Sequence, residues 1–121
     1  LMYLPSYCSF RMTDIWRSFI AQRVAWTCGW SILFHGSTVI QERNHHDLIK
    51  DFEEEVPGYK NNFKIMNKLI QLKLKPGIEN IKYNMTLCYK ELVNMKIIDK
   101  KELKLLRSWF LDLKTVTGKK I

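Results

Sequence analysis

The chain has 121 residues, of which 46% are hydrophobic, and a formal net charge of +8. The length corresponds to one domain or part of one, and the composition excludes a membrane span, because the longest apolar run, residues 24–34, is much shorter than the roughly 20 residues required. Three widely spaced cysteines (Cys8, Cys28 and Cys88) and histidines without ligand spacing predict neither a disulfide framework nor a metal site.

Two short strands are expected in the first third of the chain. The apolar segment LMYL, residues 1–4, is closed by Pro5 and is typical of a strand. The segment WSILF, residues 30–34, indicates a second, buried strand, and residues 38–40 indicate a further extended piece.

A helix is expected between these strands, from about Asp14 to Cys28. Asp14 lies in its first turn, where a negative charge suits the helix dipole, and Gly29 is a natural residue to end it. On this helix Asp14 falls on a strip of small residues, with Arg17 at the margin of the strip. Arg23 falls among apolar residues, so we expect it to be paired or to reach water.

From residue 45 onward the pattern is helical. The helices are expected over about 46–55, 59–74, 78–95 and 99–118, and Pro-Gly pairs at 57–58 and 76–77 end the first two. Asp99 and Glu102 resemble a capping box at the start of the last helix. The apolar stripes of these helices are expected to form the core.

Charge divides unevenly along the chain. Residues 1–58 have a net charge of −2, whereas residues 59–121 have a net charge of +10, and fourteen of the fifteen basic residues in the second half are lysines. Such lysines usually form a solvated face, so we expect no nucleic-acid partner. Nonspecific binding of nucleic acid or another anionic surface through this half is the alternative.

Asp14 has two interpretations that the residues alone leave open. In the first, it is a helix-terminal carboxylate that interacts with the dipole and with Arg17, contributing at most about 1 kcal/mol. In the second, it is a general base for a sugar hydroxyl at the mouth of a strand-helix junction, where arginines hold phosphate.

The runs LPSYCSFRMTDIWRSFIAQRVAW and LFHGSTVIQERN closely resemble the C-terminal region of the STELLO-type family, Golgi proteins described as glycosyltransferases, with relatives in nematodes and plants. The run KIIDKKELKLLRSWFLDLKTVTG resembles the ending of that family. The resemblance covers nearly the whole chain, and FRMTDIWR, residues 10–17, is its most specific part. A more distant likeness is to reversibly glycosylated polypeptides, the UDP-arabinopyranose mutases, whose Asp-Asp-Met-Trp element corresponds to Thr13, Asp14, Ile15 and Trp16.

The resemblance implies an α/β fold, namely the C-terminal fragment of an A-type glycosyltransferase-like domain with a few short strands followed by a helical tail. Residues 1–44 would end the α/β domain as strand, helix and strand, and residues 45–121 would form a helical region packed on it. The metal-binding acidic motif of that fold lies upstream, so no cofactor is expected within this chain. The parent protein would hold the nucleotide-sugar and a divalent metal.

The resemblance also implies roles for individual residues. Asp14 would be the catalytic base or an acceptor ligand, Arg11 and Arg17 would compensate phosphate charge, and His35 would bind donor or acceptor. The parent protein is expected to transfer a sugar from a nucleotide-sugar donor to a glycan acceptor, and the fragment alone is expected to be inactive.

The resemblance equally allows a non-catalytic Golgi factor that assists assembly or trafficking of a membrane synthase complex. In either case the expected location is the lumenal side of the Golgi membrane, with an N-terminal anchor outside this chain. A glycosylation sequon at Asn84 is consistent with a lumenal location, although it lies inside an expected helix.

Overall fold

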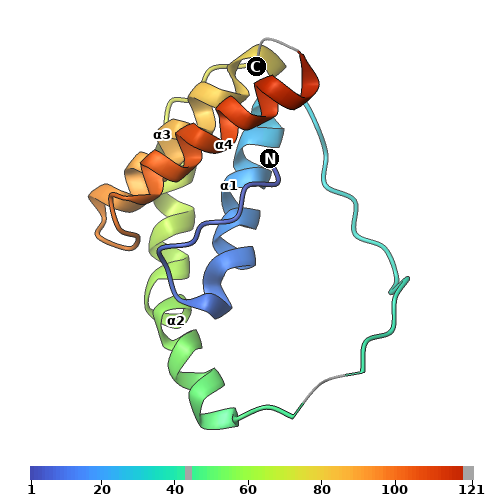
Figure 1. Cartoon of the computed structure of the whole chain (residues 1–121), viewed down its shortest axis with the longest axis vertical. Helices are drawn as coiled ribbons and strands as arrows, with labels where there is room; N and C mark the ends of the chain where they lie inside the picture. The colour runs from blue at the N-terminus through green and yellow to red at the C-terminus, as the bar shows by residue number, and fades with distance from the viewer. Residues whose placement is uncertain (43–44, 119–121) are drawn as a thin grey trace.

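The computed structural model describes residues 1–42 and 45–118, and these residues form helices and irregular segments but no strand (Figure 1). The elements are the 3₁₀ helix η1 (Phe10–Met12), α1 (Thr13–Thr27), α2 (Leu48–Gln71), the 3₁₀ helix η2 (Ile78–Asn80), α3 (Ile81–Asn94) and α4 (Glu102–Thr117). α1 and α2 lie side by side, and α3 packs against both of them and against α4. The expected α/β architecture is therefore wrong for the described part of the chain.

The N-terminal segment buries Tyr3 and Pro5 against the helices but is not a strand. Tyr3 is buried, and its ring packs edge-on against Tyr89, with 5.3 Å between the ring centroids. The backbone N–H groups of Ser6 and Tyr7 donate to the carboxylate of Glu102, at 3.0 and 2.8 Å. Because a side chain on α4 satisfies these donors, the segment is anchored without a neighbouring strand.

The second expected strand is an exposed, extended segment. Every described residue from Trp30 to Glu42 is exposed, and the exposed fraction reaches 84% for Phe34 and 99% for Ile40. The segment leaves the end of α1 and runs outside the helices (Figure 1). Strand-forming residues make a strand only where a neighbouring strand supplies hydrogen bonds and packing, and no described segment does so here.

The helix expected from Asp14 to Cys28 is confirmed as α1. Gly29 has a φ of 74° and donates to the carbonyl of Trp26, while Trp30 donates to the carbonyl of Ala25, which is the Schellman pattern of a helix end.

Arg23 is paired as expected, but with carbonyls. Its guanidinium donates to the backbone oxygens of Leu69 and Leu72, each at 2.9 Å. These carbonyls lie at the C-terminal end of α2, where a positive charge is favoured. Arg23 therefore ties the end of α2 to α1, which is a structural role.

α2 is one helix where two were expected. Asp47 caps its start, because its carboxylate accepts from the N–H groups of Ile49 and Lys50. Pro57 lies inside the helix and does not end it. A proline inside a helix removes one hydrogen bond, and its ring crowds the carbonyl four residues earlier. Here η1 contacts α2 on both sides of Pro57, through Arg11 with Asp51 and through Met12 with Gly58.

Gly58 lies where η1 packs directly against α2. It is buried, and a Cβ at this position would collide with the Met12 side chain. Glycine is therefore required here by space, since its φ is not positive.

α3 and α4 confirm the helices expected over 78–95 and 99–118, with small shifts at their ends. Asp99 accepts from the N–H of Lys101 at 2.7 Å, and Gly118 ends α4 with a φ of 62°. Glu102 does not complete a capping box, because it turns inward and is fully buried. It accepts from the Tyr3 hydroxyl as well as from the two backbone N–H groups of the N-terminal segment.

The core lies where α1, α2, α3 and α4 meet the N-terminal segment. Its most deeply buried side chains are Trp16, Ile20, Val24, Ile65, Leu69, Met85, Cys88, Tyr89, Leu92 and Leu106. This core largely confirms the apolar stripes that were expected for α1, α3 and α4. Several residues predicted as core are exposed instead: Leu48, Ile49, Phe52, Phe63, Met66, Ile70 and Ile78.

Alkaline pH is expected to destabilise the fold, because a thiol and a phenol hydroxyl that ionise at high pH are buried in the core. Burial raises the pKa of the Cys88 thiol from 9.0 to about 12 and raises the pKa of Tyr89 above its ordinary value. At high pH the folded state therefore keeps protons that the unfolded chain loses. The free energy of unfolding is unaffected by these groups below about pH 9. At higher pH it falls, by roughly 1.4 kcal/mol per pH unit for each such group.

Urea denaturation between about pH 8 and pH 11 measures this loss. Tyr89→Phe should make the free energy of unfolding fall less steeply with pH. The matched change at the exposed Tyr7, Tyr7→Phe, should leave this pH dependence unchanged. A free energy of unfolding that stays constant above pH 9 would contradict the expectation.

Candidate functional site

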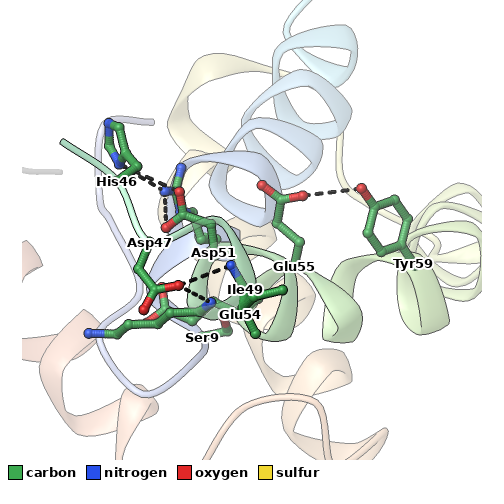
Figure 2. Close-up of polar contacts among 10 residues, drawn as sticks. Ser9, His46, Asp47, Ile49, Asp51, Glu54, Glu55 and Tyr59 are labelled. Carbon is green, nitrogen blue, oxygen red and sulfur yellow. Dashed lines mark hydrogen bonds and ion pairs between the residues drawn. The ribbon is translucent and has the colours of Figure 1, made fainter. Parts of the chain in front are cut away.

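A hollow of about 650 Å³ lies between η1, the start of α1 and the middle of α2. Its lining residues are Leu4, Phe10, Arg11, Met12, Thr13, Asp14, Ile15, Glu55, Gly58, Tyr59 and Asn62. Two of the residues singled out in the sequence, Arg11 and Asp14, are therefore brought to one site. Figure 2 shows polar contacts at the start and in the middle of α2, with His46 and Asp51 on one side of the view and Glu55 and Tyr59 on the other. Of these four residues, Glu55 and Tyr59 line the hollow.

Asp14 is exposed in the first turn of α1. One carboxylate oxygen accepts from the N–H of Ile15 at 2.9 Å, and its backbone carbonyl accepts from the Ser18 hydroxyl at 2.7 Å. Among the described residues the second carboxylate oxygen has no hydrogen-bond partner, and neither oxygen forms an ion pair. The Asp14 carboxylate is therefore available to a ligand in the hollow.

Arg11 lies at the rim of the hollow with its charge compensated. Its guanidinium forms an ion pair with Asp51, and His46 lies beside both, 3.5 Å from the Asp51 carboxylate (Figure 2). The hydrogen bond that Arg11 donates to Asp51 raises the pKa of Arg11 above its ordinary value. A phosphate at this guanidinium would have to share its positive charge with the Asp51 carboxylate or displace that carboxylate.

Arg17 and His35 lie outside the hollow. Arg17 donates to the sulfur of Met2 at 3.7 Å, and its Nε is buried without a partner among the described residues. His35 lies in the exposed segment after α1, with its Nδ1 2.6 Å from the carbonyl oxygen of Gly36. The structure therefore does not bring Arg17 or His35 to Asp14, and their proposed binding roles remain predictions.

Three residues of α2 complete the site and were not predicted from the sequence. The Tyr59 hydroxyl donates to Glu55 at 3.1 Å, and this hydrogen bond raises the pKa of Tyr59 (Figure 2). Asn62 accepts from the Trp16 indole N–H at 2.9 Å. Glu55, Tyr59 and Asn62 are spaced by four and three residues, which places them on one face of a continuous helix. The expected helix break at Pro57 concealed this relation.

The chemistry of the hollow suits a polyhydroxylated ligand. The carboxylates of Asp14 and Glu55 can accept hydrogen bonds from hydroxyl groups, and the amide of Asn62 can donate to such groups or accept from them. The exposed rings of Phe10 and Tyr59 add apolar surface at the same place. Since Arg11 is already paired with Asp51, the site offers no uncompensated positive charge for a diphosphate.

Other features of the described chain bear on location and cofactors. Within residues 1–42 and 45–118, no group of three or more His, Cys, Asp or Glu side chains could hold a metal ion. The described helices include none that is both long and apolar enough to cross a membrane.

The sequon asparagine is part of the core. Asn84 is fully buried, and its side chain bonds to both backbone groups of Lys75, at 2.9 Å to the N–H and 2.7 Å to the carbonyl. It also donates to the Thr27 hydroxyl at 3.3 Å. The folded chain therefore leaves no room for a glycan on Asn84.

Comparison with known families gives one clear result. A family model described as STELLO glycosyltransferases matches residues 11–120, which include most of the residues that line the hollow. The expected likeness to reversibly glycosylated polypeptides is not supported. Neither a curated protein nor a solved structure matches the chain significantly.

Proposed function

This chain belongs to the STELLO glycosyltransferase family, and on that basis we propose that its hollow binds the acceptor of a glycosyl transfer, with Asp14 as the general base. Membership implies a nucleotide-sugar donor and an acceptor in general terms. The observation that carries the proposal is the unpaired second oxygen of the Asp14 carboxylate, at the edge of a hollow lined by hydrogen-bonding groups and exposed aromatic rings.

In a direct displacement, an acceptor hydroxyl attacks the anomeric carbon of the donor. The new bond joins the acceptor oxygen to that carbon, the bond from the carbon to the phosphate oxygen breaks, and the nucleoside diphosphate leaves with the electron pair. Asp14 would take the proton of the attacking hydroxyl. Glu55 and Asn62 would orient the acceptor through its other hydroxyl groups, since all three side chains line the same hollow.

Fewer residues of this site are proposed to bind the donor than the acceptor. Arg11 at the rim could keep its charge paired by exchanging Asp51 for a donor phosphate. Arg17 and His35 have no part in this proposal, because neither lines the hollow. We place the reaction in the Golgi lumen, a location supported by the resemblance to the family.

An assay of the complete gene product with a panel of UDP-sugars and GDP-sugars tests this function. We expect release of nucleoside diphosphate that depends on an added oligosaccharide acceptor, together with a product whose mass increases by one sugar residue. Release that is independent of the acceptor would contradict an acceptor site in the hollow. If no donor is consumed, glycosyl transfer is excluded for that panel, and the non-catalytic role in assembly of a synthase complex becomes the better proposal.

A further inference from the structure

α2 carries an apolar stripe that the described part of the chain leaves largely exposed, although Phe19 and Trp26 of α1 lie beside its end at Met66 and Ile70. The stripe, called the α2 stripe below, consists of Ile49, Phe52, Val56, Tyr59, Phe63, Met66 and Ile70. All of these side chains are exposed except Val56, which is half-buried, and the exposed fraction is 72% for Ile49 and 71% for Phe63. Soluble monomers rarely expose a continuous apolar surface of this extent.

The spacing of the α2 stripe alternates between three and four residues along its whole length. This is the first-and-fourth pattern of a seven-residue repeat, which allows one helix to pack along another. The stripe is separate from the face that α2 already buries, since Gly58, Ile65 and Leu69 point into the core. α2 therefore has a second packing face, with the geometry that a partner helix requires.

The charges of α2 identify the partner helix. Residues 51–55 contain four acids and no base, whereas residues 60–68 contain three lysines and no acid. A second α2 in the antiparallel direction would place the acidic half of each helix against the basic half of the other. A parallel second copy would place like charges together. We propose that a second copy of this chain covers the α2 stripe, with the two α2 helices antiparallel about a two-fold axis near Pro57 and Gly58.

One register satisfies both the apolar and the charged positions. Its layers pair Ile49 with Met66, Phe52 with Phe63, and Val56 with Tyr59, each twice by symmetry. In this register the paired layers form a seam between the two α2 helices, and Glu53 of each copy lies beside this seam, next to Lys60 of the other copy. Glu53 and Lys60 are both exposed, and neither side chain has a hydrogen-bond or ion-pair partner among the described residues.

The shape of the chain permits this arrangement. α1 lies beside the second half of α2, as the contacts from Trp16 to Asn62 and from Arg23 to Leu69 show. The first half of α2 extends beyond α1 and α3 (Figure 1). In the dimer, the extended half of one copy lies on the second half of the other. Tyr59 then presents one side of its ring to the other copy and one side to the hollow.

Sedimentation equilibrium of the chain at micromolar concentrations tests the proposal. The wild type is expected to be a dimer. Glu53→Lys creates two Lys-Lys contacts across the seam and should weaken dimerisation by about tenfold or more. The double variant Glu53→Lys with Lys60→Glu restores opposite charges and should return to within about threefold of wild type. Glu79→Lys, at an exposed position on η2, is the matched control and should change nothing.

Two further variants separate the interface from folding and orientation. Phe63→Ser removes an exposed ring from the α2 stripe, so it should yield a monomer with an unchanged circular dichroism spectrum. In a parallel dimer the repeat would place Glu53 next to Leu48, so Glu53→Lys would have little effect. A monomeric wild type, a dimer insensitive to Phe63→Ser or to Glu53→Lys, or a double variant as weak as the single one would each overturn the proposal.

Discussion

Replacing Glu102 with Gln is expected to lower the free energy of unfolding by about 2–4 kcal/mol. The Glu102 carboxylate is fully buried and accepts hydrogen bonds from the Tyr3 hydroxyl and from the backbone N–H groups of Ser6 and Tyr7. A glutamine keeps only one acceptor oxygen and turns an NH₂ group toward donors. At least one buried donor would then lose its partner, which is among the more costly changes in a small fold.

The loss should be concentrated in the N-terminal segment. Tyr3 also contacts the rings of Tyr89 and Trp109, with centroid distances of 5.3 and 5.7 Å, so release of its hydroxyl would loosen this aromatic cluster. Urea denaturation followed by tryptophan fluorescence measures the total change. Glu79→Gln, an exposed glutamate outside the core, serves as the control and should change stability by less than about 0.5 kcal/mol. Equal stability of the two variants would contradict the anchoring role of Glu102.

Where local signals dominate, the sequence predicts this fold well. The end of α1 depends on Gly29 and the end of α4 on Gly118, and each glycine has the positive φ that a helix terminus favours. The stripes of α1, α3 and α4 were recognisable because one face of each helix is buried against the others.

The errors arise where tertiary contacts decide. The segments 1–4 and 30–34 have strand-forming composition, but a strand also needs a neighbour, and composition does not reveal whether one exists. The first of them is held, through the hydroxyl of Tyr3, by a glutamate nearly a hundred residues away. The helix break predicted at Pro57 and Gly58 is absent because η1 packs against this part of α2. No local sequence pattern predicts that contact.

The candidate site could be predicted only in part, because some of its residues are brought together by tertiary contacts. Arg11 and Asp14 are neighbours at the junction of η1 and α1, so their proximity follows from the sequence. Glu55 and Tyr59 reach the hollow only because α2 is continuous and packs on η1. The change from acidic to basic composition near residue 58 was visible in the sequence, but its position in the middle of one helix was not.

The FRMTDIWR element, of which residues 11–17 lie in the range that the family model matches, combines two roles. Met12 and Trp16 are buried, and Trp16 is bound through its indole N–H to Asn62. Asp14 lies between them in the sequence and faces solvent. The buried residues of the element thus position an acid whose second carboxylate oxygen has no hydrogen-bond partner among the described residues.

Asp14→Asn is expected to reduce acceptor-dependent sugar transfer by the complete gene product by about 100-fold or more, because an amide cannot take the proton of the attacking hydroxyl. The same change should alter the free energy of unfolding by less than about 1 kcal/mol, since the carboxylate is exposed and its one hydrogen bond can be kept by the amide oxygen. Asp112→Asn, at an exposed position on α4, is the matched control and should affect neither quantity.

The rate of sugar transfer by Asp14→Asn, measured on protein shown to be folded, is the most direct test of the assignment of Asp14 to catalysis. The site described above predicts a fall of at least about 100-fold at saturating donor and acceptor with the fold intact. Transfer at the wild-type rate by the folded variant would contradict it and would leave Asp14 as a helix-terminal charge without a part in the reaction.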